Sequence, residues 1–121
     1  MKIFFDGGCR PNPGAMEIAV VARGEATIRR DLGHGTRLDA EWLALIEALR
    51  IAQSLGVSDA VLLGDAADVV AHASGTLKPR GAAVPHYEAY RTLAGVTAPR
   101  VRHIKRTQNL AGIALARRHH R

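Results

Sequence analysis

The first third of the chain alternates between apolar and polar positions with the short period of β-strands. Residues 2–6 form an apolar run that ends on Asp6, and the glycine- and proline-rich segment 7–14 predicts a tight turn. Residues 16–23 are apolar and β-branched enough for a buried strand, and residues 25–32 alternate as an edge strand does. Together these segments predict an antiparallel meander of three strands.

Beyond residue 38 the apolar positions recur at three- and four-residue steps, the period of a helix. The stripe predicts a helix with Asp39 as its N-cap and Gly56 just past its end. A buried strand, two helices, a short strand and a last helix should follow over residues 60–65, 66–74, 85–93, 100–104 and 108–118. The order β-β-β-α-β-α-α-β-α indicates an α/β fold with a mixed sheet and packed helices. Because chains usually divide only beyond roughly 250 residues, we expect one domain over residues 1–121.

Composition excludes several classes of protein. The chain is 47% apolar and 23% charged, which is ordinary for a folded globular domain. Its apolar runs are shorter than the roughly 18–20 residues that span a bilayer, and Asp6 comes too early for a secretory signal. Cys9 is the single cysteine, so the chain cannot form an internal disulfide. We therefore expect a cytoplasmic domain and exclude a membrane protein, a secreted disulfide-rich domain and a zinc ribbon.

The net charge of +6 is unevenly distributed. Residues 1–60 hold seven basic and eight acidic side chains, whereas residues 61–121 hold ten and three, with no acid after Glu88. A basic half of this kind suits a polyanion such as nucleic acid, and it equally suits a merely solvated surface. The final His119 and His120 lie in a basic tail that we expect to be frayed.

Three acids occupy positions that stability alone does not explain. Asp6 and Asp65 each close a predicted strand, and Glu41 lies in the first turn of the long helix. If the two strands are parallel neighbours, both aspartates emerge at the carboxyl edge where α/β sheets place their sites. Carboxylates held that close need a cation, and oxygen ligands without a His/Cys set point to Mg²⁺ or Mn²⁺. Each acid alone could be a cap or a helix-dipole partner, but the three together favour a metal site.

Four segments resemble the motifs of type 1 ribonuclease H in order and spacing. Phe5–Cys9 with Asn12–Gly14 resembles its "DGSC…GNPG" opening, and Ala40–Leu45 resembles its "AEyxAL" helix. Gly64–Ala66 resembles its "DS" strand end, and His103–Asn109 resembles the "HVpRexN" segment of members with a short final loop. The resemblance covers nearly the whole chain. The chain lacks a basic protrusion.

This resemblance implies a five-stranded mixed sheet, with three antiparallel strands followed by two parallel to the first, flanked by helices. It implies hydrolysis of the RNA strand of RNA–DNA hybrids with two divalent ions, leaving 5′-phosphate and 3′-hydroxyl ends. Asp6, Glu41 and Asp65 match catalytic, metal-binding carboxylates of the family. We expect the hybrid as partner, no membrane and no obligate protein partner. The predicted substrate contacts are Gly7, Gly8, Asn12, Thr36, Lys105, Arg106 and Asn109. Without the resemblance, the two basic residues among them could equally belong to a solvated loop.

Two departures from the family pattern leave a second function open. The family's fourth carboxylate is replaced by Ile113, and Asp68, the remaining nearby acid, is expected to be exposed. Arg37 and Leu38 stand where many members carry asparagines that read 2′-hydroxyl groups. The chain could therefore be a weakened ribonuclease H or a non-catalytic ribonuclease H-like domain that binds nucleic acid.

Overall fold

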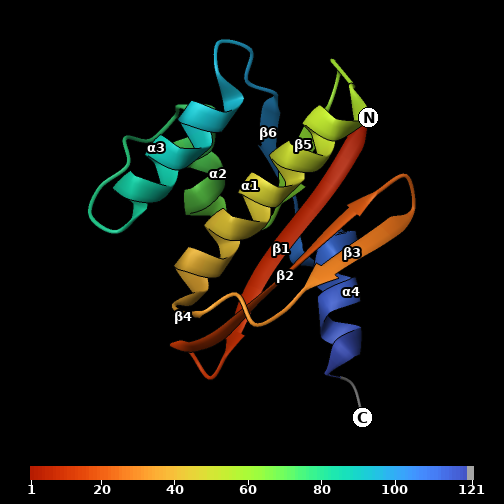
Figure 1. Ribbon diagram of the computed structural model, residues 1–121, viewed down its shortest axis with the longest axis vertical. Coiled ribbons are helices and arrows are strands. Elements are labelled where there is room, and N and C mark those ends of the chain that lie inside the picture. The colour runs from red at the N-terminus through yellow and green to blue at the C-terminus, as the bar shows by residue number, and fades with distance from the viewer. Residues whose placement is uncertain (120–121) are drawn as a thin grey trace.

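The computed structural model describes residues 1–119 as a mixed sheet with helices on both faces (Figure 1). Its elements are β1 (Lys2–Arg10), β2 (Gly14–Ala22), β3 (Glu25–Arg29), β4 (His34–Gly35), α1 (Arg37–Leu55), β5 (Val61–Gly64), α2 (Ala67–Ser74), α3 (Ala83–Ala94), β6 (Arg100–His103), the 3₁₀ helix η1 (Arg106–Gln108) and α4 (Leu110–Arg118). Within the described residues, no helix is both long and apolar enough to cross a membrane.

The sheet order is β3-β2-β1-β5-β6, with the first two pairings antiparallel and the last two parallel. This confirms the predicted mixed sheet and the parallel pairing on which the two-aspartate argument depended. The predicted number of strands was one too few. The two-residue strand β4 pairs with β2 through Gly35 and His34, which gives a six-stranded sheet. A strand this short leaves no periodic signal in the sequence.

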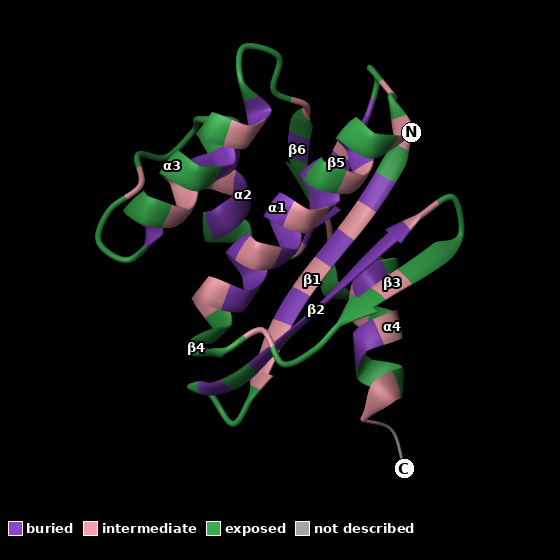
Figure 2. Cartoon of the chain, in the orientation of Figure 1, coloured by how far each residue is buried: buried purple, intermediate pink, exposed green. Residues whose placement is uncertain are grey.

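The pleat of β1 divides the apolar residues between the two faces of the sheet. Ile3 and Phe5 are fully buried in the main core with Trp42 of α1. Phe4, between them in sequence, contacts a smaller cluster on the other face. That cluster contains Ala19, Val21, Ala111 and Leu115 and lies beneath α4. Figure 2 shows the resulting alternation of buried and partly buried positions along β1.

β1 is longer than the sequence predicts. It continues past Asp6 to Arg10, because residues 7–10 pair with β2 through Gly7↔Ile18 to Arg10↔Ala15. The predicted turn over 7–14 is therefore wrong in its extent and shrinks to residues 11–13. Asp6 still lies just beyond the last parallel pair with β5, Phe4↔Leu63. Asp6 is therefore placed by the end of the parallel pairing between β1 and β5, and not by the end of strand β1.

The N-cap of the long helix lies three residues upstream of the predicted one. Thr36 is the N-cap, and its hydroxyl accepts a hydrogen bond from the Asp39 backbone N–H at 3.2 Å. The Asp39 carboxylate in turn accepts from the Thr36 N–H at 2.9 Å, so the two form a capping box. Both residue types favour the cap position, which is why Asp39 was wrongly assigned to it. The predicted end is confirmed, with Gly56 in the left-handed conformation at φ 67°.

The last segment also differs from its prediction. The helix expected from residue 108 begins at Leu110, after η1 has turned the chain. His119 is not frayed: its ring bonds the carboxylate of Glu17 on β2. His120 and Arg121 lie outside the described residues.

Candidate active site at the carboxyl edge of the sheet

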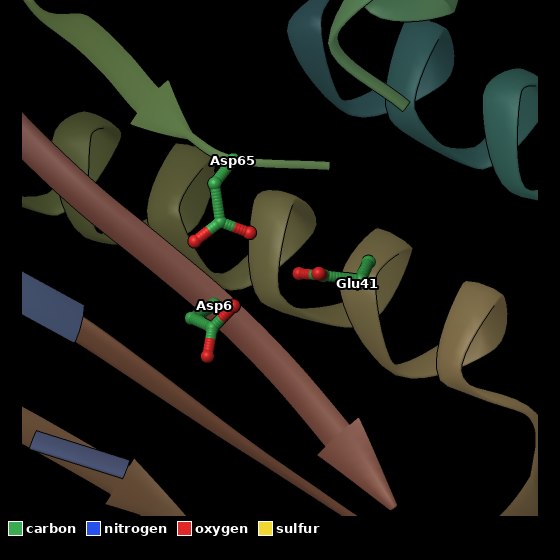
Figure 3. Close-up of side chains that lie close together, drawn as sticks. All are labelled: Asp6, Glu41 and Asp65. Carbon is green, nitrogen blue, oxygen red and sulfur yellow. The ribbon is translucent and has the colours of Figure 1, made fainter. Parts of the chain in front are cut away.

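Three carboxylates from three elements meet beside β1, as the sequence predicts. Asp6 lies on β1, Asp65 directly follows β5, and Glu41 lies on α1. Each offers an oxygen, and these oxygens all lie within 4.8 Å of one another. Figure 3 shows the side chains converging on one space between the strands and the helix. The parallel pairing of β1 with β5 brings the aspartates together, and the packing of α1 on β1 adds the glutamate.

A glycine allows the helix to come this close to the strand. A Cβ atom on Gly7 would lie 2.2 Å from the carbonyl oxygen of Ala40, so no other residue fits there unless the backbones separate. The Gly7 N–H donates to Oε1 of Glu41 at 2.9 Å and fixes that carboxylate. Its second oxygen, Oε2, is buried and has no hydrogen-bond partner among the described residues. In the described part of the chain, the positive charge closest to Oε2 is Nη2 of Arg37, 3.9 Å away.

The environment opposes ionisation of the site. Burial, followed by repulsion from Asp65, raises the pKa of Asp6 to about 7. Burial, followed by repulsion from Asp6, raises the pKa of Glu41 to about 8. The charge of Arg37 and the Gly7 N–H act in the other direction on both groups. A divalent cation would remove this repulsion and give the unpartnered Oε2 a ligand role, so the residues present fit Mg²⁺ or Mn²⁺.

Two hollows open beside the carboxylates. One has a volume of about 200 Å³ and is lined by Asp6, Gly8 and Arg106 among others. The second has a volume of about 350 Å³ and is lined by Glu41 and Asp65, together with the exposed Asp68. Arg37 lines both hollows. Sequence reasoning did not select Arg37 as a site residue, although its spacing four residues before Glu41 on a helix predicts that the two share a face.

A sequence profile described as reverse transcriptase-like matches residues 4–119. The chain belongs to this family of ribonuclease H-like domains. No curated protein sequence matches the chain.

The fold is that of type 1 ribonuclease H, as the sequence motifs imply. The N-terminal RNase H domain of Rv2228c from Mycobacterium tuberculosis is 26% identical, with 98% of this chain and 97% of that one covered and a TM-score of 0.77. RNase H1 of the archaeon Halobacterium salinarum is 26% identical over 94% and 92%, with a TM-score of 0.75. LC11-RNase H1, isolated from compost, is 26% identical over 94% and 90%, with a TM-score of 0.78. LC11-RNase H1 has also been solved in complex with an RNA/DNA hybrid.

In this ribonuclease H-like fold, Asn109 has a role that the sequence did not predict. The residue is fully buried, which is at odds with a contact to substrate. Its amide nitrogen donates to the Phe5 carbonyl at 3.0 Å and to Oδ2 of Asp65 at 3.1 Å. Its amide oxygen accepts from the Ala111 N–H at 3.1 Å and caps α4. Asn109 therefore orients a site carboxylate and starts the last helix.

Two more predicted contacts also serve the architecture. The side-chain oxygen of Asn12 accepts from the Arg37 N–H at 3.1 Å, which ties the β1–β2 turn to the start of α1. Thr36 is the cap of that helix. Lys105 is exposed and does not line either hollow, whereas Gly8 and Arg106 line the hollow at Asp6. Four of the predicted contacts therefore share a hollow with the Asp6 carboxylate: Gly7, Gly8, Asn12 and Arg106.

The last helix brings a glycine over Asp6. A Cβ atom on Gly112 would lie 3.5 Å from Oδ2 of Asp6, which is ordinary van der Waals contact, and both residues line the same hollow. Ile113, the residue that matches the family's fourth carboxylate, follows it and is 39% exposed. Neither residue supplies a ligand, so the described cluster consists of three acids.

Proposed function

We propose that this domain is a divalent-metal-dependent endonuclease that hydrolyses the RNA strand of RNA–DNA hybrids and leaves 5′-phosphate and 3′-hydroxyl ends. The observation that carries the proposal is the cluster of Asp6, Glu41 and Asp65, whose oxygens lie within 4.8 Å at the carboxyl edge of the sheet. Family membership and the likeness to solved RNase H structures support a nuclease. The chemistry of the donors supports Mg²⁺ or Mn²⁺.

Each carboxylate has a distinct support. Asp6 lies on β1 between the other two elements, and its charge raises the pKa of Glu41. Glu41 is held by the Gly7 N–H, and Asp65 is held by the Asn109 amide. When bound, divalent ions activate a water molecule and stabilise the departing 3′ oxygen. The protein's part is to hold the three carboxylates in place and to bind the phosphate beside them.

Basic groups next to the carboxylates support a polyanionic substrate. Arg37 and Arg106 line the hollow at Asp6, and residues 61–121 carry ten basic against three acidic side chains. Guanidinium groups pair well with phosphate oxygens, and free backbone donors at the start of a helix favour anions. The exposed Lys105, just before η1, extends this basic surface. We expect hybrid binding to weaken steeply with salt as counterions are released.

A second candidate function rests on what the site lacks. The three-carboxylate cluster has Ile113 where the family carries an acid, and Arg37 and Leu38 cannot copy the amide readout of 2′-hydroxyl groups. A domain of this kind could bind nucleic acid through its basic half without cutting it.

One assay separates the two functions. A labelled RNA–DNA hybrid is incubated with the chain in Mg²⁺ and, separately, in Mn²⁺, with Asp6→Asn as control. Cleavage of the RNA strand that disappears with Asp6→Asn supports the nuclease. Binding without cleavage in either metal supports the binding domain and overturns the proposed activity. Cleavage that survives Asp6→Asn would remove these carboxylates from the mechanism.

A further inference from the structure

Arg37 occupies the boundary between the two hollows of the site. It is the first residue of α1 and lines both the hollow at Asp6 and the hollow at Glu41 and Asp65. Its Nη2 atom lies 3.9 Å from Oε2 of Glu41, which is close enough for attraction and too far for a hydrogen bond. The backbone of Arg37 is fixed by Asn12, while its side chain is 52% exposed. The guanidinium is thus anchored at its base and free to reorient at its tip.

The helix itself gains nothing from this cation. The N-terminus is the positive end of the helix dipole, where basic side chains are unfavourable. The pair with Glu41 also runs in the less favourable direction, because the acid follows the base by four residues. Since the capping box of Thr36 and Asp39 already starts the helix, a stability role does not account for Arg37.

The charges of the site suggest what Arg37 does. The three carboxylates carry −3 when all are ionised. One divalent ion adds +2 and the Arg37 guanidinium adds +1, which balances the three carboxylates; Arg106 and Asp68, each lining one hollow, carry opposite charges. Two divalent ions and the guanidinium together would leave the site at +2. Neutrality before substrate binds is therefore reached with one ion and Arg37.

We infer that Arg37 is a catalytic residue that binds the phosphate to be cleaved, and that its guanidinium together with one tightly bound divalent ion supplies the positive charge of the site. The inference rests on the proposed function. A guanidinium suits this task because its planar fork matches two non-bridging phosphate oxygens. In the reaction, the hydroxyl of water bonds to phosphorus as the bond to the 3′ oxygen breaks, and the remaining proton ends on that oxygen. Arg37 stays protonated throughout and only donates hydrogen bonds.

Three variants of the full chain test the inference. Arg37→Asn removes the charge, and Arg37→Lys keeps the charge without the planar fork. Arg50→Asn is the matched control, because Arg50 lies on the same helix, is exposed and, within residues 1–119, pairs only with Glu47 at 3.6 Å. Mn²⁺ binding is measured by calorimetry without substrate, and cleavage is measured on a labelled RNA–DNA hybrid at saturating Mn²⁺. Thermal unfolding of each variant reports whether the fold is intact.

The two readouts should move in opposite directions. Arg37→Asn should bind Mn²⁺ about threefold more tightly, because a competing positive charge is lost. The same variant should cleave about a hundredfold more slowly, because the developing charge on the phosphate loses a donor. Arg37→Lys should keep the wild-type Mn²⁺ affinity and cleave at an intermediate rate. Arg50→Asn should change neither quantity, and the wild-type chain should show one tight Mn²⁺ site. A role confined to starting the helix would move the unfolding temperature and neither of these quantities.

Unchanged cleavage by Arg37→Asn at saturating Mn²⁺ would overturn the inference, as would two equally tight Mn²⁺ sites in the wild-type chain. Failure of the proposed function has a different signature, because the wild-type chain would then leave the hybrid intact in both metals. That result would overturn the catalytic role of Arg37 as well.

Discussion

The close contact between β1 and α1 can be tested at a single atom. Gly7→Ala adds a Cβ that would lie 2.2 Å from the Ala40 carbonyl oxygen and 2.7 Å from the Glu41 nitrogen. Ordinary contacts at this position begin near 3.4 Å, so the strand and the helix must separate by about 1.2 Å. Both neighbours are backbone atoms in regular elements, and neither can rotate away as a side chain would.

The expected cost follows from two effects. Overpacking of a well-packed interface costs about 3 kcal/mol when no side chain can yield. Separation also stretches the 2.9 Å hydrogen bond from the Gly7 N–H to Glu41. The loss of such a bond to a buried carboxylate adds about 1–2 kcal/mol. The sum, about 4 kcal/mol, is a large fraction of the stability of an ordinary domain and should lower the melting temperature by more than about 10 °C.

Gly8→Ala is the matched control for this substitution. A Cβ on Gly8 meets only Cδ2 of Leu115, at 3.8 Å, so the free energy of unfolding should change by less than about 1 kcal/mol. Urea unfolding of both variants, followed by circular dichroism, gives the comparison directly. Equal stabilities would refute the backbone-to-backbone packing of β1 on α1, and with it the explanation of how Glu41 reaches the site.

Three further predictions concern the carboxylates. Because the pKa values of Asp6 and Glu41 are raised in the folded chain, the folded chain binds more protons than the unfolded chain, and the free energy of unfolding without metal should fall as pH rises from about 5 to about 8. Midpoints of urea unfolding in the presence of a chelator should show this fall, and saturating Mg²⁺ should reverse it. A flat profile would contradict the pKa shifts. Asn109→Ala should weaken Mn²⁺ binding about tenfold in calorimetry, because a site carboxylate loses the amide that orients it, and unchanged affinity would contradict that role. Ile113→Asp should raise the rate of cleavage in Mg²⁺ by about tenfold or more. Leu110→Asp, which adds the same charge at another exposed position of α4, should leave that rate unchanged. Equal cleavage rates for the two variants would mean that position 113 does not face the ions.

The sequence predicted the site better than it predicted the boundaries of the elements. Asp6 and Asp65 could be paired because each follows an apolar run, and parallel strands place their carboxyl ends at one edge. Glu41 could be assigned to the same site because it lies in the first turn of the helix that follows the three-stranded meander. These inferences depend only on the order of elements and on residue type, both of which local patterns carry.

What the sequence could not predict depends on contacts between distant segments. The extension of β1 to Arg10 depends on pairing with β2, and a segment rich in glycine and proline gives no local sign of it. The burial of Asn109 depends on a carbonyl of β1, 104 positions earlier in the chain. The position of Arg37 between two hollows depends on how α1 lies against both aspartate-bearing segments. Such features follow from packing geometry, which residue spacing alone does not determine.

The supports of the three carboxylates explain how like charges are held close together. Repulsion among Asp6, Glu41 and Asp65 would separate them if they were free to move, yet each lies in or directly beside an element whose position is set by other contacts. The Gly7 N–H holds Glu41 through the packing of β1 on α1, and the Asn109 amide holds Asp65 while it also bonds the carbonyl of Phe5. Burial, followed by the repulsion that these contacts maintain, raises the pKa values of Asp6 and Glu41. A cation that binds displaces protons and finds its ligands already in place, so little of its binding energy is needed to order the protein.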